Sequence, residues 1–299
     1  MLQEGIVETA CPEELSETHL EQFREDGYVA FEGVLSADEV DAARSALSEI
    51  TIALMKRAQR GEAEIRERPN ATKNYAGKQV IDPDSGFGIH FEPRVDPLAL
   101  PPEEAELNFR KLHGYHQEHP TFVKLALHHP RISGFLTQIL GEEAVLKADM
   151  ALSKPPFIGS EKPWHQDNAY FNWLPLEKLA TAWIALDDTT VENGCMHVLP
   201  GGHKVGALKH HHTIDCEILP DRIDKNQAVP LPMKAGGVMY FSAMLPHQTP
   251  PNRTSSRRRA LQFQYRGVST HQVSKEDFGK VFAEADGTPA SCALAYEDG

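Results

Sequence analysis

The sequence has no hydrophobic run long enough to cross a bilayer, and basic residues are few for its length. It contains 30 Lys and Arg against 43 Asp and Glu, a formal net charge of −13. A nucleic-acid-binding protein needs a basic face to displace counterions, and a transmembrane helix needs about 20 apolar residues. We therefore expect neither a nucleic-acid nor a membrane partner. An anionic small molecule is not excluded, because one local arginine can hold it against the overall field.

Cysteine is also scarce. Cys11, Cys195, Cys216 and Cys292 are widely scattered and form no CxxC motif. This pattern predicts reduced thiols instead of a disulfide framework. The first 20 residues are acidic and lack a basic segment followed by an apolar one, so no secretory signal is predicted. Together these features predict a cytoplasmic protein.

The first third of the chain reads as helical. A capping box from Ser36 to Glu39 opens a long amphipathic stretch over residues 36–58. Residues 62–104 are rich in Pro, Asp, Glu and Gly, which predicts long loops. Residues 108–140 again favour helix, interrupted near Pro120 and Pro130.

From about residue 145 the pattern changes to short β-rich segments separated by turn residues. In the segment RALQFQYR, Leu261, Phe263 and Tyr265 alternate with polar residues, which predicts a strand with one buried and one solvated face. Many short strands with Gly and Pro turns favour a barrel or a jelly roll. The absence of βαβ alternation argues against a doubly wound α/β fold. The fold class predicted is mainly β with flanking α-helices.

The stretch KPWHQDNAYF places His165 and Asp167 two residues apart, so that both can point to one side of a strand. Two histidines and one carboxylate with open positions form the facial triad of non-haem Fe(II) oxygenases. His247, after a later apolar strand, can supply the second histidine. The basic run Arg257–Arg259 follows it, and a guanidinium fork beside such a triad can hold a dicarboxylate co-substrate.

Four ordered blocks give the chain a family resemblance. They are FREDGYVAFEGVLSADEV (23–40), PWHQDNAYF (163–171), WIALDDTTVENGCMHVLPGGHK (183–204) and HQTPPNRTSSRRRAL (247–261). In these blocks the chain resembles the phytanoyl-CoA dioxygenase family of Fe(II)/2-oxoglutarate-dependent oxygenases. The resemblance implies a double-stranded β-helix, in agreement with the strand pattern. It also implies Fe(II) as the metal, with 2-oxoglutarate and O₂ as co-substrates.

The resemblance also implies roles for individual residues. His165, Asp167 and His247 match the metal ligands, and Arg258 matches the residue that binds the C5 carboxylate of 2-oxoglutarate. The remaining matches to co-substrate-binding positions are Thr249, Trp183, Met150 and Lys111. No separate catalytic acid or base is implied. On this basis we expect a single domain over residues 1–299, with a helix-rich part to about 140, a jelly-roll metal-binding core over about 141–270 and a tail over 271–299.

Several alternatives remain open. Arg257 or Arg259 could replace Arg258, although on a strand those two face the opposite side. Trp183 could be ordinary core, and His90 could line a substrate pocket. His197 and His203 are expected to be structural, and His210–His212 to lie in a solvated loop or strand edge.

The predicted function is a non-haem Fe(II)- and 2-oxoglutarate-dependent dioxygenase that hydroxylates, or otherwise oxidises, a small molecule and releases succinate and CO₂. Because Asp167 is present, hydroxylation is favoured over halogenation, for which related enzymes have Ala or Gly at that position. The alternatives are a cupin-like metal enzyme that does not use 2-oxoglutarate, and a non-catalytic jelly-roll binding protein. No basic cluster beyond Arg257–Arg259 is visible in the sequence, which favours a small metabolite over an acyl-CoA. The oligomeric state is not predicted.

Overall fold

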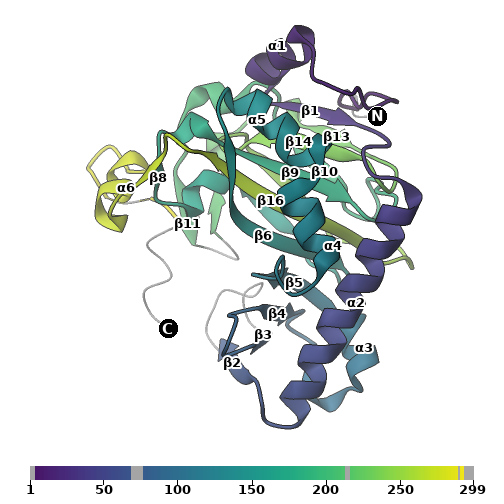
Figure 1. Cartoon of the computed structure of the whole chain (residues 1–299). Coiled ribbons are helices and arrows are strands. Elements are labelled where there is room, and N and C mark those ends of the chain that lie inside the picture. Colours follow the sequence, from purple (N-terminus) through teal and green to yellow (C-terminus); the bar gives the residue numbers. More distant parts are fainter. Residues whose placement is uncertain (1–3, 69–76, 213–215, 289, 293–299) are drawn as a thin grey trace.

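Two antiparallel sheets form the body of the protein (Figure 1). The computed structural model describes residues 4–68, 77–212, 216–288 and 290–292. The larger sheet has nine strands in the order β1-β14-β9-β16-β6-β5-β4-β3-β2, and the smaller has four in the order β13-β10-β15-β7. The strands of the larger sheet are β1 (Tyr28–Phe31), β2 (Glu64–Arg68), β3 (Gly77–Ile81), β4 (Gly88–Phe91), β5 (Phe109–His113), β6 (Ala144–Lys154), β9 (Leu179–Ala185), β14 (Val238–Ser242) and β16 (Arg258–Gly267).

The smaller sheet and two short strand pairs complete the β structure. Strand β11 pairs with β12, and β17 pairs with β8. These strands are β7 (Lys162–His165), β8 (Trp173–Leu174), β10 (Met196–Val198), β11 (His210–His212), β12 (Cys216–Ile218), β13 (Val229–Leu231), β15 (His247–Thr249) and β17 (His271–Gln272). The helices are α1 (Glu17–Asp26), α2 (Ala37–Gln59), α3 (Pro102–Glu106), α4 (Pro120–Val123), α5 (Phe135–Leu140) and α6 (Lys275–Val281).

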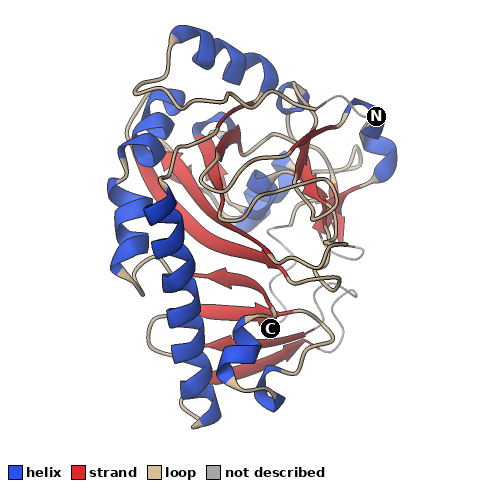
Figure 2. Ribbon diagram, turned by 90° about the vertical axis from the view of Figure 1, so that its right-hand side faces the viewer, coloured by secondary structure: helices blue, strands red, loops and turns tan. Residues whose placement is uncertain are grey.

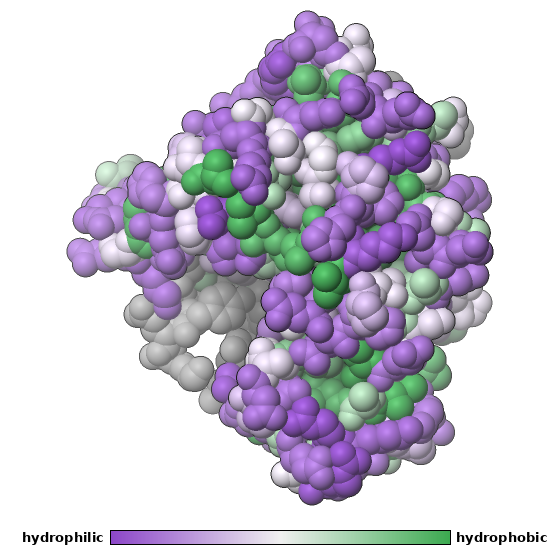
Figure 3. Space-filling view, viewed as in Figure 1, coloured by the Kyte–Doolittle hydropathy of each residue, from purple (hydrophilic) through white to green (hydrophobic). Residues whose placement is uncertain are grey.

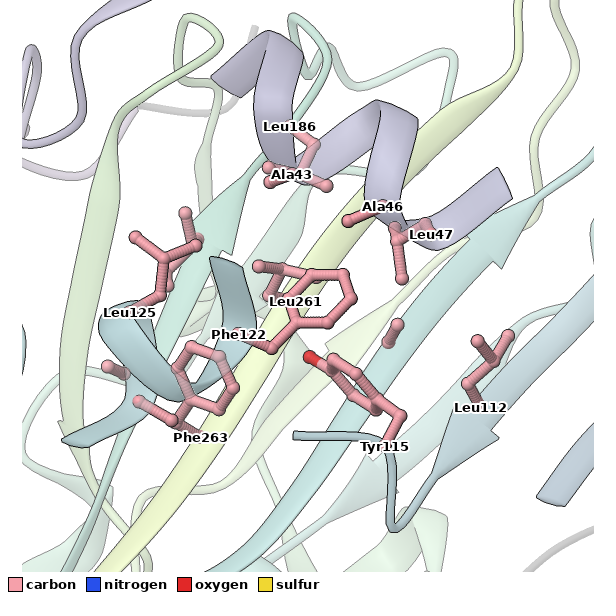
Figure 4. Packing of buried hydrophobic residues seen from close by; sticks show 14 of the residues in the cluster. Ala43, Ala46, Leu47, Leu112, Tyr115, Phe122, Leu125, Leu186, Leu261 and Phe263 are labelled. Carbon is pink, nitrogen blue, oxygen red and sulfur yellow. The ribbon is translucent and has the colours of Figure 1, made fainter. Parts of the chain in front are cut away.

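Helix α2 runs along one side of the larger sheet (Figure 2). It begins as the sequence predicts: the backbone N–H of Glu39 donates to Ser36 Oγ at 3.3 Å, and Glu39 Oε2 accepts from the Ser36 N–H at 3.1 Å. Its apolar stripe belongs to the largest hydrophobic cluster, which also contains Leu261 and Phe263 of β16 and Tyr115 after β5 (Figure 4). This helix-side core covers one face of the nine-stranded sheet.

A second hydrophobic cluster lies between the two sheets. Trp183 on β9, Ala260 on β16 and Val198 on β10 are all members, and each is fully buried. Strands of both sheets therefore face each other across an interior, as in a jelly roll. The predicted fold class, mainly β with flanking helices, is confirmed.

The predicted loops over residues 62–104 are partly wrong. Strands β2, β3 and β4 lie there and extend the larger sheet through β5, which pairs with β6. Strand β5 itself falls in a stretch predicted to be helical. These segments are polar and their alternation is weak, so only pairing with distant strands defines them. Residues 69–76 of this stretch lie outside the described residues. After Pro120 the chain is helical as predicted, with α4, two π-helical turns broken at His129 and Pro130, and α5.

The prediction of four reduced cysteines is wrong for one pair. Cys216 and Cys292 form a disulfide across a sequence separation of 76 residues, whereas Cys11 and Cys195 are free. The two sulfurs meet because the C-terminal segment returns to the β body, where the Cys292 N–H donates to the Ala169 carbonyl at 3.0 Å. The spacing of the cysteines along the sequence does not predict this contact.

The histidine run also differs from its expected solvated position. His210 is buried, and its Nε2 accepts a hydrogen bond from the Gln166 N–H at 2.9 Å. His197 packs as a structural residue, with Nδ1 3.2 Å from the Cys195 carbonyl oxygen.

On the face of the molecule drawn in Figure 3, hydrophilic residues predominate and hydrophobic ones form scattered groups. None of the helices in the described part of the chain combines the length and the apolar character that a membrane crossing requires.

Candidate metal and co-substrate site

Three side chains from a span of 82 residues, His165 to His247, converge between the sheets. His165 ends β7, Asp167 opens the turn that follows, and His247 begins β15 directly opposite His165 in the strand register (247 − 165 = 82). Asp167 Oδ1 lies 3.5 Å from His165 Nε2 and 3.6 Å from His247 Nε2. One ligand atom from each of the three residues lies within 4.8 Å of the others, and all three residues are buried. This spacing suits a single metal ion.

The backbone orients both imidazoles toward the same point. His165 Nδ1 lies 2.8 Å from the Pro163 carbonyl oxygen, and His247 Nδ1 lies 2.9 Å from the Leu245 carbonyl oxygen. A carbonyl can only accept, so each Nδ1 carries the proton and each Nε2 presents a lone pair. Such contacts to the second ring nitrogen are typical of metal-ligating histidines.

Two side chains hold the carboxylate of Asp167. Its Oδ2 accepts from Thr181 Oγ1 at 2.9 Å and from Gln262 Nε2 at 3.2 Å, which leaves Oδ1 toward the two histidines. Burial opposes ionisation of Asp167, but the two histidines, which stabilise the carboxylate whenever a ring is protonated, hold its pKa well below the usual range. The carboxylate is therefore ionised at neutral pH.

Burial, with repulsion from His165, lowers the pKa of His247 to about 3. A neutral imidazole with a free lone pair and an ionised carboxylate are the forms that bind a divalent cation. Geometry and protonation therefore agree with the predicted triad.

Arg258 lies in the same interior at the start of β16. It is only 1% exposed, and within the described part of the chain its Nε and Nη1 have no hydrogen-bond partner. Its guanidinium lies 5.5 Å from the ring centroid of Trp183, whose Nε1 is also buried without a partner. Burial lowers the pKa of Arg258 to about 10. A buried cation without a counter-charge is costly, so this arrangement fits an anionic ligand.

The two flanking arginines point away from this interior. Arg257 Nη1 pairs with Glu106 at 2.9 Å, and Arg259 Nη2 pairs with Asp187 at 2.8 Å. The alternation expected for a strand is confirmed, and of the three arginines only Arg258 faces the triad.

One cavity of about 630 Å³ collects every residue that the sequence analysis assigned to the site. Met150 and Trp183 flank Gln262 from the two neighbouring strands, and Lys111 lies opposite Leu152 on the next strand. His90, the possible pocket residue, also lines the cavity. The full set of predicted residues at its wall is Lys111, Met150, His165, Asp167, Trp183, His247, Thr249 and Arg258.

Three further residues of the site, two that support the triad and a second buried cation, were not predicted from the sequence. Thr181 and Gln262 carry no motif, although the glutamines that alternate with apolar residues in β16 were a visible signal. Lys154 is 4% exposed, lies opposite Arg258 in the register, and its Nζ donates to the carbonyl oxygens of Ser160 (2.5 Å) and Thr249 (3.2 Å). Lys154 thereby fixes the end of β15, which carries His247.

The cavity wall is also far more basic than the sequence suggests. Eight of its residues are Lys or Arg and three are Asp or Glu, in a chain of net charge −13. The sequence showed no basic cluster beyond Arg257–Arg259 because these cations come from six different strands. They are Arg66, Lys78, Arg110, Lys111, Lys147, Lys154, Lys162 and Arg258.

A jelly roll with such a triad defines the architecture of non-haem iron oxygenases. Solved structures with similar folds support this assignment of the architecture. The non-haem alpha ketoglutarate dependent carbocyclase SnoK from nogalamycin biosynthesis aligns with a TM-score of 0.62 and 26% identity, covering 90% of this chain and 89% of SnoK. EvdO2 from Micromonospora carbonacea var. aurantiaca, complexed with 2-oxoglutarate, aligns with a TM-score of 0.56 and 25% identity, covering 90% and 96%.

Sequence comparison is more specific. The phytanoyl-CoA dioxygenase family model matches residues 23–260. The mouse (Mus musculus) phytanoyl-CoA dioxygenase domain-containing protein 1 is 27% identical over 261 residues, which cover 82% of this chain and 88% of the mouse protein. Human (Homo sapiens) peroxisomal phytanoyl-CoA dioxygenase is 30% identical over 155 residues, 48% of this chain and 46% of the human one. The chain belongs to the phytanoyl-CoA dioxygenase family, within the Fe/2-oxoglutarate-dependent oxygenase superfamily.

Proposed function

We propose that this protein is an Fe(II)- and 2-oxoglutarate-dependent dioxygenase that hydroxylates, or otherwise oxidises, a small molecule. The observation that carries the proposal is the buried guanidinium of Arg258, whose Nε and Nη1 have no hydrogen-bond partner among the described residues and which lines the same cavity as the candidate triad. A metal site alone would suit many enzymes. A metal site with a buried, uncompensated arginine fits an anionic co-substrate as well.

His165, Asp167 and His247 would hold the iron. Their donor set of two imidazoles and one carboxylate suits Fe(II) and leaves the other coordination positions open. Thr181 and Gln262 would keep Asp167 in place, since each donates to the oxygen that faces away from the histidines.

Arg258 would bind the far carboxylate of 2-oxoglutarate through its guanidinium fork. Trp183 and Thr249 line the same part of the cavity and would shape the space around the co-substrate. Met150 and Lys111 would contact it from the β6 and β5 side. These roles come from the family resemblance and from the shared cavity.

When bound, iron and 2-oxoglutarate supply O₂ activation by oxidative decarboxylation, which yields succinate and CO₂. The protein positions the bound groups and keeps water away from them. The Nε2 atoms of the two histidines and an ionised aspartate would bind the cation, and Arg258 would orient the co-substrate. The buried wall of β9 and β16 keeps water from this part of the site. We propose hydroxylation in preference to halogenation because Asp167 occupies the carboxylate position.

The test is iron-dependent conversion of 2-oxoglutarate to succinate by the purified protein. We expect succinate with Fe(II), none after chelation, and none from an Asp167→Gly variant, which loses both a ligand and its charge. If the variant forms succinate at the wild-type rate, the site is misassigned. If wild-type protein loaded with iron forms no succinate with any substrate mixture, the proposal is refuted. The non-catalytic and the 2-oxoglutarate-independent alternatives are then favoured.

A further inference from the structure

A lysine near the candidate metal site departs from the regular alternation of its strand. Gln264 on β16 lies opposite Ala148 on β6, but the next residue, Tyr265, lies opposite Leu146. Lys147 is therefore the extra residue of a β-bulge, a feature that re-aims side chains and often lies next to active sites. Leu146 packs against the helix-side core, whereas both Lys147 and Ala148 line the cavity.

Lys147 has an aromatic neighbour and no counter-ion. Its Nζ lies 5.0 Å from the ring centroid of Phe171, which follows Asp167 by four residues (171 − 167 = 4) and lines the same cavity. No carboxylate in the described ranges comes within ion-pair distance of this ammonium. Burial lowers the pKa of Lys147, and repulsion from Arg266 adds to the effect. The half-buried charge thus lies where a negative partner would stabilise it.

A second lysine lines the same cavity from the other sheet. Lys162 begins β7, the strand that ends with His165, and its Nζ donates to Tyr170 Oη at 2.6 Å. Lys147 and Lys162 therefore reach the cavity from different sheets.

The few acidic residues of the wall do not cancel this charge. Asp167 is the candidate metal ligand, and Asp149 is held by the backbone N–H groups of Gly114 and His116. Only Glu161 remains among the three acidic residues lining the cavity. Arg258, with Lys154 beside it, is accounted for by the co-substrate. Arg66 and Lys78 pair with Glu64 and Asp96, whereas Lys147 has no ion-pair partner within the described residues.

We propose that the substrate oxidised at this site is an organic anion whose carboxylate or phosphate group is bound by Lys147 at the bulge of β6. The statement that the anion is oxidised rests on the proposed function, whereas the anion site itself does not. Because Lys147, Phe171 and the triad line one cavity, an anion bound by this ammonium would lie in the same space as the metal site. Phe171 offers an apolar face to the carbon skeleton next to that group.

The experiment uses the full chain loaded with Ni(II) and saturating 2-oxoglutarate, so that the triad and Arg258 are occupied. Acetate, inorganic phosphate and the neutral isostere acetamide are titrated by calorimetry. We expect saturable binding of at least one anion and none of acetamide. The anion that binds more tightly identifies the group as carboxylate or phosphate.

Substitutions then locate the anion. In Lys147→Gln its affinity should fall about tenfold or more, the usual loss for a charge-assisted hydrogen bond. Lys147→Arg should retain most of the affinity. The matched control is Lys56→Gln, which removes one positive charge from an exposed lysine that pairs with Glu103 and is not part of the cavity wall. Unchanged 2-oxoglutarate affinity of Lys147→Gln shows that this variant remains folded.

Three results would overturn the anion site: no saturable binding of either anion, equal affinities in wild type and Lys147→Gln, or acetamide binding as tightly as acetate. Succinate formation from 2-oxoglutarate, measured on the same wild-type preparation with Fe(II), separates this failure from failure of the proposed function. Turnover without anion binding refutes only the anion site. Anion binding without turnover refutes only the oxygenase.

Discussion

The two faces of strand β16 are both buried, but their side chains meet different surroundings. On one face Leu261 and Phe263 belong to the helix-side core, where Phe263 lies beside Leu125 (Figure 4). On the other face Arg258 and Gln262 line the cavity between the sheets. Exposure does not separate them, since Phe263 is 0% and Arg258 is 1% exposed. What separates core from site is whether the buried polar atoms find partners within the protein.

This contrast has an energetic meaning. A buried apolar side chain stabilises the fold through the contacts that it already has. A buried polar group without a partner costs free energy until a ligand supplies one. Substitutions on the core face should therefore change stability, and substitutions on the cavity face should change binding.

The largest effect on the cavity side is expected at the triad. His165→Ala removes one of only three candidate ligands, so Fe(II) affinity should fall by more than about 100-fold, since even loss of a supporting partner costs 10–100-fold. Metal content after dialysis, together with circular dichroism to verify folding, measures this. A folded variant with full iron occupancy would exclude His165 as a ligand.

The largest effect on the core side is expected at Phe263. Phe263→Ala should lower the free energy of unfolding by about 3–5 kcal/mol, through lost transfer energy and a cavity in the helix-side core. Urea unfolding followed by tryptophan fluorescence measures it. The iron affinity of the protein that remains folded should be unchanged. A large loss of iron binding without loss of stability would contradict the assignment of the two faces.

Substitution of Arg258 should weaken 2-oxoglutarate binding without changing metal affinity. Arg258→Ala should weaken 2-oxoglutarate binding by about 2–5 kcal/mol, because truncating one partner leaves the other charge buried and unpaired. That is on the order of 30- to several-thousand-fold. Arg258→Lys should recover only part of the loss, since an ammonium lacks the bidentate fork.

The matched control for Arg258 is its neighbour on the other face. Arg259→Gln should leave 2-oxoglutarate affinity unchanged and reduce stability instead, because it breaks the ion pair with Asp187. Titration of 2-oxoglutarate into both variants distinguishes them. If Arg259 shows the loss and Arg258 does not, the co-substrate binds elsewhere.

The smallest effect is expected at a supporting residue. Thr181→Val keeps the shape of the side chain but removes the hydroxyl that donates to Asp167 Oδ2. Iron affinity should fall by about 10-fold, the lower end for second partners of metal ligands. An unchanged metal affinity would show that Gln262 alone positions the carboxylate.

The contrast also explains where sequence reasoning worked. Alternation in RALQFQYR was enough to predict strand β16 and its apolar face. The other face was expected to be solvated, but Gln262 is only 5% exposed. A polar residue on an alternating strand reads the same whether it meets solvent or an internal cavity, so the pattern could not separate the two.

Local signals by themselves determined the capping box of α2, the strands after residue 145 and the pairing of His165 with Asp167 as a motif. Each depends on residues that are neighbours along the chain. The sequence also carried the family resemblance, and with it the eight candidate site residues that now share one cavity.

Only the tertiary structure decided the rest. Strands β2–β5 exist because β6 offers an edge on which they pair, and the disulfide exists because the C-terminal segment returns across 76 residues. The basic cavity wall arises in the same way, since its cations lie on separate strands and become neighbours only when the two sheets form. Contacts between residues distant in sequence are set by the packing of whole sheets, and no local pattern encodes them.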